Sequence, residues 1–203
     1  MTIEKGKAWG QARPLPVDGV VVHSDAEARA AITTARRRGD VLPTLGLLGG
    51  DLCRTLGGTG DEARLRSSAA MTFPCDLGIV EIGGEELVFV AHLIARRTWW
   101  FGRQVAVMNA QWLGRWDLGP RSHPNDGLLD LTDGTLPLGQ RLEARRRLHT
   151  GTHVPHPALD TRRAPTFTLD LDPALGVWLD GQRVARAGHL EVRCEPDALH
   201  VVV

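Results

Sequence analysis

The first part of the chain shows a strand–helix–strand pattern of hydrophobic and polar positions. Two short apolar runs, at residues 19–23 and 44–50, lie on either side of a polar stretch that is rich in arginine. Ser24 and Glu27 in that stretch have the spacing of a capping box, so we expect a helix over residues 25–38. A strand, a helix and a second strand in this order predict one βαβ unit.

The remainder of the chain consists mostly of short apolar runs of the kind that form strands. Glycine-containing pairs separate several of these runs, and we interpret them as hairpin turns. The pairs are Gly83-Gly84, Asp126-Gly127, Asp133-Gly134 and Asp180-Gly181. Only residues 138–148 have a clear helical pattern in this half.

These elements predict a protein of the α+β class with three parts. We expect an irregular N-terminal arm at residues 1–18 and a small α/β part, with the βαβ unit, at residues 19–69. A larger, mainly antiparallel, sandwich-like β domain with one helix should follow at residues 70–203.

Composition narrows the function classes and the compartment. The 24 basic residues equal the 24 acidic residues in number, so no basic excess favours nucleic acid as a partner. Three widely spaced cysteines (Cys53, Cys75 and Cys194) are typical of reduced thiols rather than of a disulfide framework. The N-terminus does not resemble a signal peptide, and no apolar run approaches the roughly 20 residues of a membrane span. We therefore expect a cytoplasmic protein without a transmembrane segment.

Two short motifs carry acidic residues beside glycine. In HPNDGLLD (residues 123–130), the Asp-Gly pair favours a hairpin, and one carboxylate with backbone carbonyls is an alternative site for Mg²⁺ or Ca²⁺. In WLDGQ (178–182), Asp180 is typical of a hairpin turn, although a carboxylate at a strand end can also act as a general base.

Two further motifs suggest binding. LLGGDLCRTLGG (47–58) brings glycines to a strand-to-helix turn, where free amides can bind phosphate, although it lacks a complete nucleotide signature. TWWFGR (98–103) gathers aromatic residues that usually belong to a core; an apolar acyl pocket or a partner surface is the alternative.

The order of these motifs resembles that of the diacylglycerol kinase, sphingosine kinase and bacterial lipid kinase family, whose fold is shared with NAD kinases. HPNDGLLDL is similar to the "DDGLLDV" turn of this family, and VWLDGQ (177–182) to its "lDGE" element. LEVRCEPDALHVVV (190–203) is similar to the closing strands. LGLLGGDLCRTLG (45–57) is similar to a shortened "lGiiPlGTgNDfArtLG" segment.

The resemblance implies a metal site and a catalytic base. It places a structural Mg²⁺ at the side chain of Asp126 and at the backbone carbonyls of His123 and Leu128. It makes Asp180 the general base that takes the proton from a lipid hydroxyl. Gln182 replaces the glutamate of the family element, so the second acid is missing.

The nucleotide side departs from the family pattern. His23-Ser-Asp-Ala-Glu27 stands where the family has "GGDGT", so that Asp25 matches but the glycines do not. The "GTgND" loop is shortened to Gly49-Gly50-Asp51. Asp25, Gly49, Gly50 and Asp51 are thus the candidate nucleotide-binding residues, and the capping box competes with phosphate for the same amides.

We therefore expect a truncated, degenerate lipid-kinase-like protein without a conventional ATP site. It would act as a binding or regulatory module for a lipid or another amphiphile. The first alternative is an active ATP-dependent lipid kinase, completed by a homodimer or a partner subunit. The second is a structural or interaction protein, for which the aromatic residues of TWWFGR would fill a core.

Overall fold

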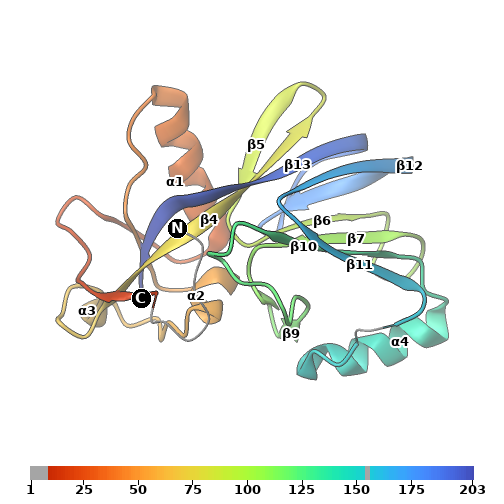
Figure 1. Cartoon of the computed structure of the whole chain (residues 1–203), viewed down its shortest axis with the longest axis horizontal. Helices are drawn as coiled ribbons and strands as arrows, with labels where there is room; N and C mark the ends of the chain where they lie inside the picture. The colour runs from red at the N-terminus through yellow and green to blue at the C-terminus, as the bar shows by residue number, and fades with distance from the viewer. Residues whose placement is uncertain (1–8, 154–155) are drawn as a thin grey trace.

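One continuous β-sheet organises the protein (Figure 1). The computed structural model describes residues 9–153 and 156–203. The sheet has 11 strands, and two of its long members, β4 (Met71–Ile82) and β13 (Gln182–Val202), pair antiparallel over most of β4. Because β3 (Leu45–Leu47), from the first predicted part, pairs with the end of β13, the sheet crosses the expected boundary at residue 70. The division into domains stays a prediction.

The βαβ unit is confirmed in the first part. β2 (Val20–Val22) and β3 (Leu45–Leu47) pair in parallel, with α1 (Asp25–Arg38) between them in sequence. β3 also pairs in parallel with the end of β13, which joins this unit to the large sheet. Two short helices follow, α2 (Asp51–Thr55) and α3 (Glu62–Leu65).

The expectation of an irregular arm at residues 1–18 is only partly correct. Residues 1–8 lie outside the described part of the chain. β1 (Gln11–Ala12) is a short strand that pairs antiparallel with Met71 and Thr72 at the start of β4. Backbone pairing with an edge thus orders a segment that has no strand pattern of its own.

The larger part is antiparallel, which confirms the α+β class. The strand order β4-β13-β12-β6-β7-β10-β11 continues the sheet, with β5 on the other side of β4. These strands are β5 (Glu85–Phe89), β6 (His92–Arg96), β7 (Gln104–Met108), β10 (Leu129–Gly134), β11 (Leu159–Ala164) and β12 (Thr166–Leu179). Phe89, Leu93, Leu131 and Val192, from four different strands, share one buried core, so the sheet folds back on itself as a sandwich.

Smaller elements cover the other faces. Ile32 of α1 is fully buried with Leu77 of β4 in a second core, which fixes the helix against the sheet. A two-stranded hairpin is formed by β8 (Trp112–Leu113) and β9 (Trp116–Asp117). The expected second helix is α4 (Leu138–Arg147), which continues into η1 (Leu148–Thr150) and connects β10 to β11.

Two of the four predicted turns are hairpins. Gly83-Gly84 joins β4 to β5, and Asp180-Gly181 joins β12 to β13; all four residues have the positive φ of a type I′ turn. The other two predictions are wrong. Asp133-Gly134 lies inside β10, paired on both sides, and Asp126-Gly127 precedes β10 without joining two paired strands.

Two further expectations concern the cysteines and the membrane. The three cysteines are free thiols, as expected. Within residues 9–153 and 156–203, no helix is long and apolar enough to span a bilayer.

Candidate functional site

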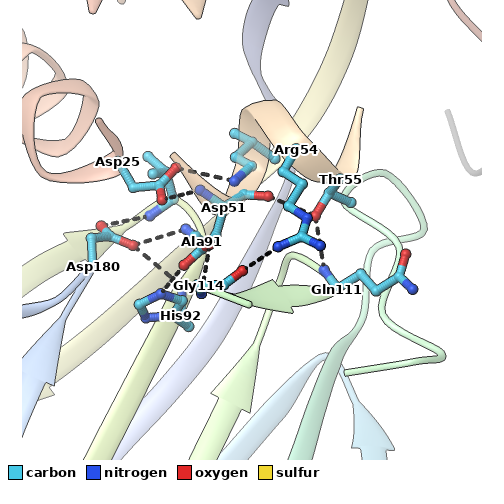
Figure 2. A network of polar contacts seen from close by, with 11 residues as sticks. Asp25, Asp51, Arg54, Thr55, Ala91, His92, Gln111, Gly114 and Asp180 are labelled. Carbon is cyan, nitrogen blue, oxygen red and sulfur yellow. Dashed lines mark hydrogen bonds and ion pairs between the residues drawn. The ribbon is translucent and has the colours of Figure 1, made fainter. Parts of the chain in front are cut away.

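Asp180 lies at the centre of a buried polar cluster (Figure 2). The type I′ turn between β12 and β13 directs its carboxylate at the start of β6. There it accepts hydrogen bonds from the backbone amides of Val90 (3.0 Å), Ala91 (2.9 Å) and His92 (3.2 Å). Arg29 Nε of α1 lies 3.8 Å from the same carboxylate. Asp180 thus holds the β6 backbone in place, whatever else it does.

Asp25 connects the two helices of this cluster. It is the first residue of α1, and its carboxylate accepts from the amides of Asp51 (2.5 Å) and Leu52 (3.1 Å) at the start of α2. Gly50 makes the approach feasible, since a Cβ on it would lie 2.5 Å from the Asp25 carboxylate oxygen. Gly49 packs equally closely on the carbonyl of His23. All four predicted nucleotide-binding residues therefore lie together, but they pack against the β2–α1 connection.

His92 completes the cluster and was not predicted as a site residue. Its Nε2 forms a 3.0 Å hydrogen bond with Asp51 Oδ2, while Asp51 Oδ1 accepts from the amide of Gly114 (2.8 Å). No spacing rule in the sequence relates His92 to Asp51, because only the fold brings β6 to α2. Gln182, in place of the family glutamate, accepts a hydrogen bond from Arg29.

The charges of the cluster perturb one another. Burial, reinforced by the negative charge of Asp180, raises the pKa of Asp25 to about 6. Burial also raises the pKa of Asp180, against the opposing effect of His92. Burial would lower the pKa of His92, but the hydrogen bond to Asp51 and the charge of Asp180 outweigh it and raise this pKa. The cluster therefore favours holding extra positive charge, as protons or as a cation.

Asp25, Asp51 and His92 have the chemistry of a metal site. One donor atom from each lies within 4.8 Å of the other two. Two carboxylates and an imidazole suit Zn²⁺ or Mn²⁺ better than Mg²⁺, which prefers oxygen donors alone. These are the residues that could hold a divalent ion at the cluster.

The helix ends beside the cluster are already capped. Ser24 Oγ accepts from the amide of Glu27 (3.2 Å), and the Glu27 carboxylate accepts from the amide of His23 (2.8 Å), so the predicted capping box is present. The start of α2 is capped by Asp25. Phosphate binds helix N-termini through free amides and would meet carboxylates at both positions.

The turn with the predicted Mg²⁺ ligands is held together by protein groups. The Asp126 carboxylate forms an ion pair with the guanidinium of Arg163 and accepts from the amide of Leu128 (3.0 Å). His123 Nδ1 accepts from the amide of Asn125 (3.2 Å). Since a guanidinium already neutralises Asp126, the residues present do not fit a bound Mg²⁺ well. The metal at His123, Asp126 and Leu128 stays a prediction.

Asp76 anchors this turn and was missed by the sequence analysis. Its buried carboxylate accepts from the amides of Gly127 (2.7 Å) and Asp197 (3.0 Å). Its own amide donates to the carbonyl of Pro124 (2.7 Å). Burial raises the pKa of Asp76, which the amide of Gly127 partly offsets. HPNDGLLD is therefore a loop that the buried Asp76 carboxylate anchors, in addition to the ion pair of Asp126 with Arg163.

An apolar pocket lies between α4 and the outer face of β6, β7 and β10. Its volume is about 90 Å³. Since one water molecule needs roughly 10–15 Å³ by the same measure, the pocket has room for several. Trp99 and Trp116 line it, stacked edge to face with ring centroids 5.6 Å apart. The other apolar lining residues include Ile94, Ala106, Leu118, Leu136 and Leu148. Trp99 of the TWWFGR motif thus lines a pocket and also packs against the buried cluster of Ile94, Ala106 and Met108.

The protein thus combines a β-sandwich of NAD-kinase-like fold with a βαβ unit. The chain belongs to the family described as YegS C-terminal NAD kinase beta sandwich-like domain, whose sequence profile matches residues 79–203. No protein among the curated sequences matches the chain.

Solved structures support the same fold. Two structures of a candidate diacylglycerol kinase from Bacillus anthracis str. Sterne are similar over 91% of this chain and 77% of theirs, with TM-scores of 0.69 and 0.64. A third structure, of a diacylglycerol kinase from the same organism, has a TM-score of 0.53 over 79% of this chain and 66% of its own. Identities are 14%, 13% and 15%, so these likenesses concern the fold alone.

Proposed function

We propose that this lipid-kinase-like protein binds a lipid or another amphiphile in its β domain and does not bind ATP in the conventional way. The observation that carries the proposal is the apolar pocket under α4. Trp99, Trp116 and Ile94 offer an acyl chain a lining of hydrocarbon and aromatic surface. Ligand sites are commonly apolar hollows with a few convergent polar groups.

The polar cluster and the pocket are joined by one short hairpin. Gly114, in the turn between β8 and β9, donates its amide to Asp51, and its carbonyl accepts from Arg54 Nη1 (2.5 Å), as Figure 2 shows. Trp116 in β9 lines the pocket. A ligand with a polar head and an apolar tail therefore has suitable chemistry on both sides of this hairpin.

The nucleotide side supports the second half of the proposal. A kinase needs its nucleotide phosphates held in line with the acceptor. Here Asp25 and Glu27 occupy the amides that phosphate would use, and Asp51 adds a third carboxylate close by. Three acidic groups disfavour a polyphosphate by charge repulsion.

Amphiphile binding is tested by titration with a fluorescent diacylglycerol analogue and with sphingosine. Ala106 lies in the pocket wall on β7, so Ala106→Leu should fill part of the space and weaken binding at least tenfold. Ala63→Leu, on the exposed side of α3, is the matched control and should bind normally. Equal binding by both variants, or no binding by the unchanged protein, would contradict the proposal.

Calorimetry with Mg-ATP tests the nucleotide half. We expect no binding in the micromolar range, and such binding would overturn this half of the proposal. Transfer of radiolabelled phosphate to diacylglycerol or a sphingoid base would instead favour the kinase alternative. Loss of that transfer in Asp180→Asn, in a variant shown to be folded, would then assign the general base.

A further inference from the structure

Exposed apolar side chains gather on one part of the surface. Within the described residues, four of the seven exposed large hydrophobic residues belong to two segments that pack together. Trp100 (47% exposed) and Phe101 (63%) lie in the loop between β6 and β7. Leu138 (46%) and Leu142 (45%) lie on α4. A concentration of this kind commonly marks an interaction site.

The two segments form one continuous surface. Leu138 and Leu142 are four residues apart and share a helix face, on which Arg145 follows three residues later. The Arg145 guanidinium lies over the Trp100 ring, 4.5 Å from its centroid. Arg141 Nη2 donates to the carbonyl of Gly102 (2.7 Å) and fixes the loop to the helix. We call this surface, made of residues 97–103 and the exposed face of α4, the aromatic–arginine face.

The aromatic–arginine face is strongly basic in a chain whose net charge is zero. Its two segments, 97–103 and 138–147, contain six arginines and one glutamate, a net charge of +5. Arg103 is paired with Asp133 and Arg141 is buried, but Arg97 and Arg146 are exposed. The sum over the whole chain conceals this asymmetry.

We propose that the aromatic–arginine face docks on the surface of an anionic lipid bilayer. Tryptophan is enriched at membrane interfaces, where its ring lies at the level of the head groups. Each exposed arginine adds attraction to anionic lipid. A helix with leucines on one face and arginines beside them is suited to lie in the interface plane. This inference goes beyond the proposed function, because a pocket ligand could equally arrive from solution.

Charge argues against the main alternative occupant. A second copy of the chain would place one basic face against another, and like charges across an interface oppose association. The position of the pocket favours a membrane, because the pocket lies directly behind the aromatic–arginine face. Trp99 and Arg145 belong to this face, Arg141 fixes its loop to α4, and all three line the pocket. Lipid would therefore enter directly beneath the docking surface.

Vesicle flotation tests the proposal with the whole chain. The protein is mixed with vesicles of phosphatidylcholine alone or of phosphatidylcholine with phosphatidylglycerol. We expect binding to the anionic vesicles only, weakened by salt as Debye screening requires. The double variant Trp100→Ala, Phe101→Ser should bind at least about tenfold more weakly, and the charge reversal Arg146→Glu about tenfold to 30-fold more weakly.

Two matched variants control for general surface effects. Arg38 is the last residue of α1, and Val41 (94% exposed) follows this helix. The variants Arg38→Glu and Val41→Ser should bind vesicles as the unchanged protein does. Thermal unfolding verifies that each variant is folded. Binding of a soluble fluorescent amphiphile should persist in all of them, which separates this inference from the proposed function.

Three outcomes would overturn the inference. The first is absence of binding to anionic vesicles. The second is equal binding by the Trp100, Phe101 variant and the Val41 control. The third combines two results for the Trp100, Phe101 and Arg146 variants. Their vesicle binding is unchanged, but sedimentation velocity shows that they have lost a dimer or a complex with a defined acidic protein. In that case another macromolecule covers the face.

Discussion

The Asp25 carboxylate makes the stability of this protein depend on pH, and the variant Asp25→Asn isolates its contribution. Burial and the charge of Asp180 raise the pKa of Asp25 from 3.8 to about 6. Between these two values the folded protein holds a proton that the unfolded chain has released. The free energy of unfolding must therefore fall as the pH rises through this window.

The size of the effect follows from the pKa difference. Each unit corresponds to about 1.4 kcal/mol, so a rise of about two units costs the folded state roughly 3 kcal/mol once Asp25 is ionised. The loss is spread between about pH 4 and pH 6 and is complete by about pH 7. The raised pKa of His92 adds a change in the same direction, because its stabilising proton leaves as the pH rises through the folded value.

Urea unfolding at a series of pH values measures this contribution. The asparagine side chain introduced by Asp25→Asn has no charge and keeps one oxygen that can accept from the amides of Asp51 or Leu52, so α2 retains a cap. We expect the plot of unfolding free energy against pH to be flatter for this variant than for the unchanged protein. Asp160→Asn, at an exposed ion pair, should leave the plot unchanged. If Asp25→Asn and the unchanged protein had the same slope, the assigned pKa and its cause would be wrong.

Three further substitutions test particular contacts. Asp180→Ala removes the acceptor of three buried amides and should destabilise the protein by about 3–5 kcal/mol in urea unfolding, with a loss under about 1 kcal/mol contradicting the contacts. Gly50→Ala should destabilise by at least about 2 kcal/mol more than Gly57→Ala, since both have positive φ but only Gly50 faces a carboxylate at 2.5 Å. Mg²⁺ should not raise the melting temperature of the unchanged protein, because Arg163 already neutralises Asp126. The variant Arg163→Gln should permit such a rise. A rise in the unchanged protein would refute this interpretation.

The sequence predicted those elements whose stabilising contacts lie between residues close together in the chain. Ser24 and Glu27 fix the start of α1 through hydrogen bonds within four residues, so the helix has the expected limits. Asp180-Gly181 requires two residues that tolerate positive φ, and the turn follows from their chemistry. The same pair of residue types failed at Asp133-Gly134, where Arg103 binds the carboxylate and strands on both sides continue the ladder.

The composition of the polar cluster could not be predicted, because its contacts are long-range. The sequence presents Asp25 as a first-turn residue of α1, yet its carboxylate caps another helix 26 residues later. His92 has no motif and becomes important only because β6 starts beside α2. The family resemblance named Asp25, Asp51 and Asp180 as separate candidates, and the fold adds the histidine that connects them.

One face of β6 runs from the polar cluster to the apolar pocket. Alternate residues of a strand face the same side, so His92, Ile94 and Arg96 lie in a row along one face. His92 contacts Asp51 in the polar cluster, Ile94 lines the pocket, and the Arg96 guanidinium lies 4.1 Å from the Trp99 ring centroid. Successive members of such a row are about 7 Å apart, which is the length of a few methylene groups. Under the proposed function, a single amphiphile would thus place its polar head at the cluster and its apolar tail in the pocket, on the two sides of the β8–β9 hairpin.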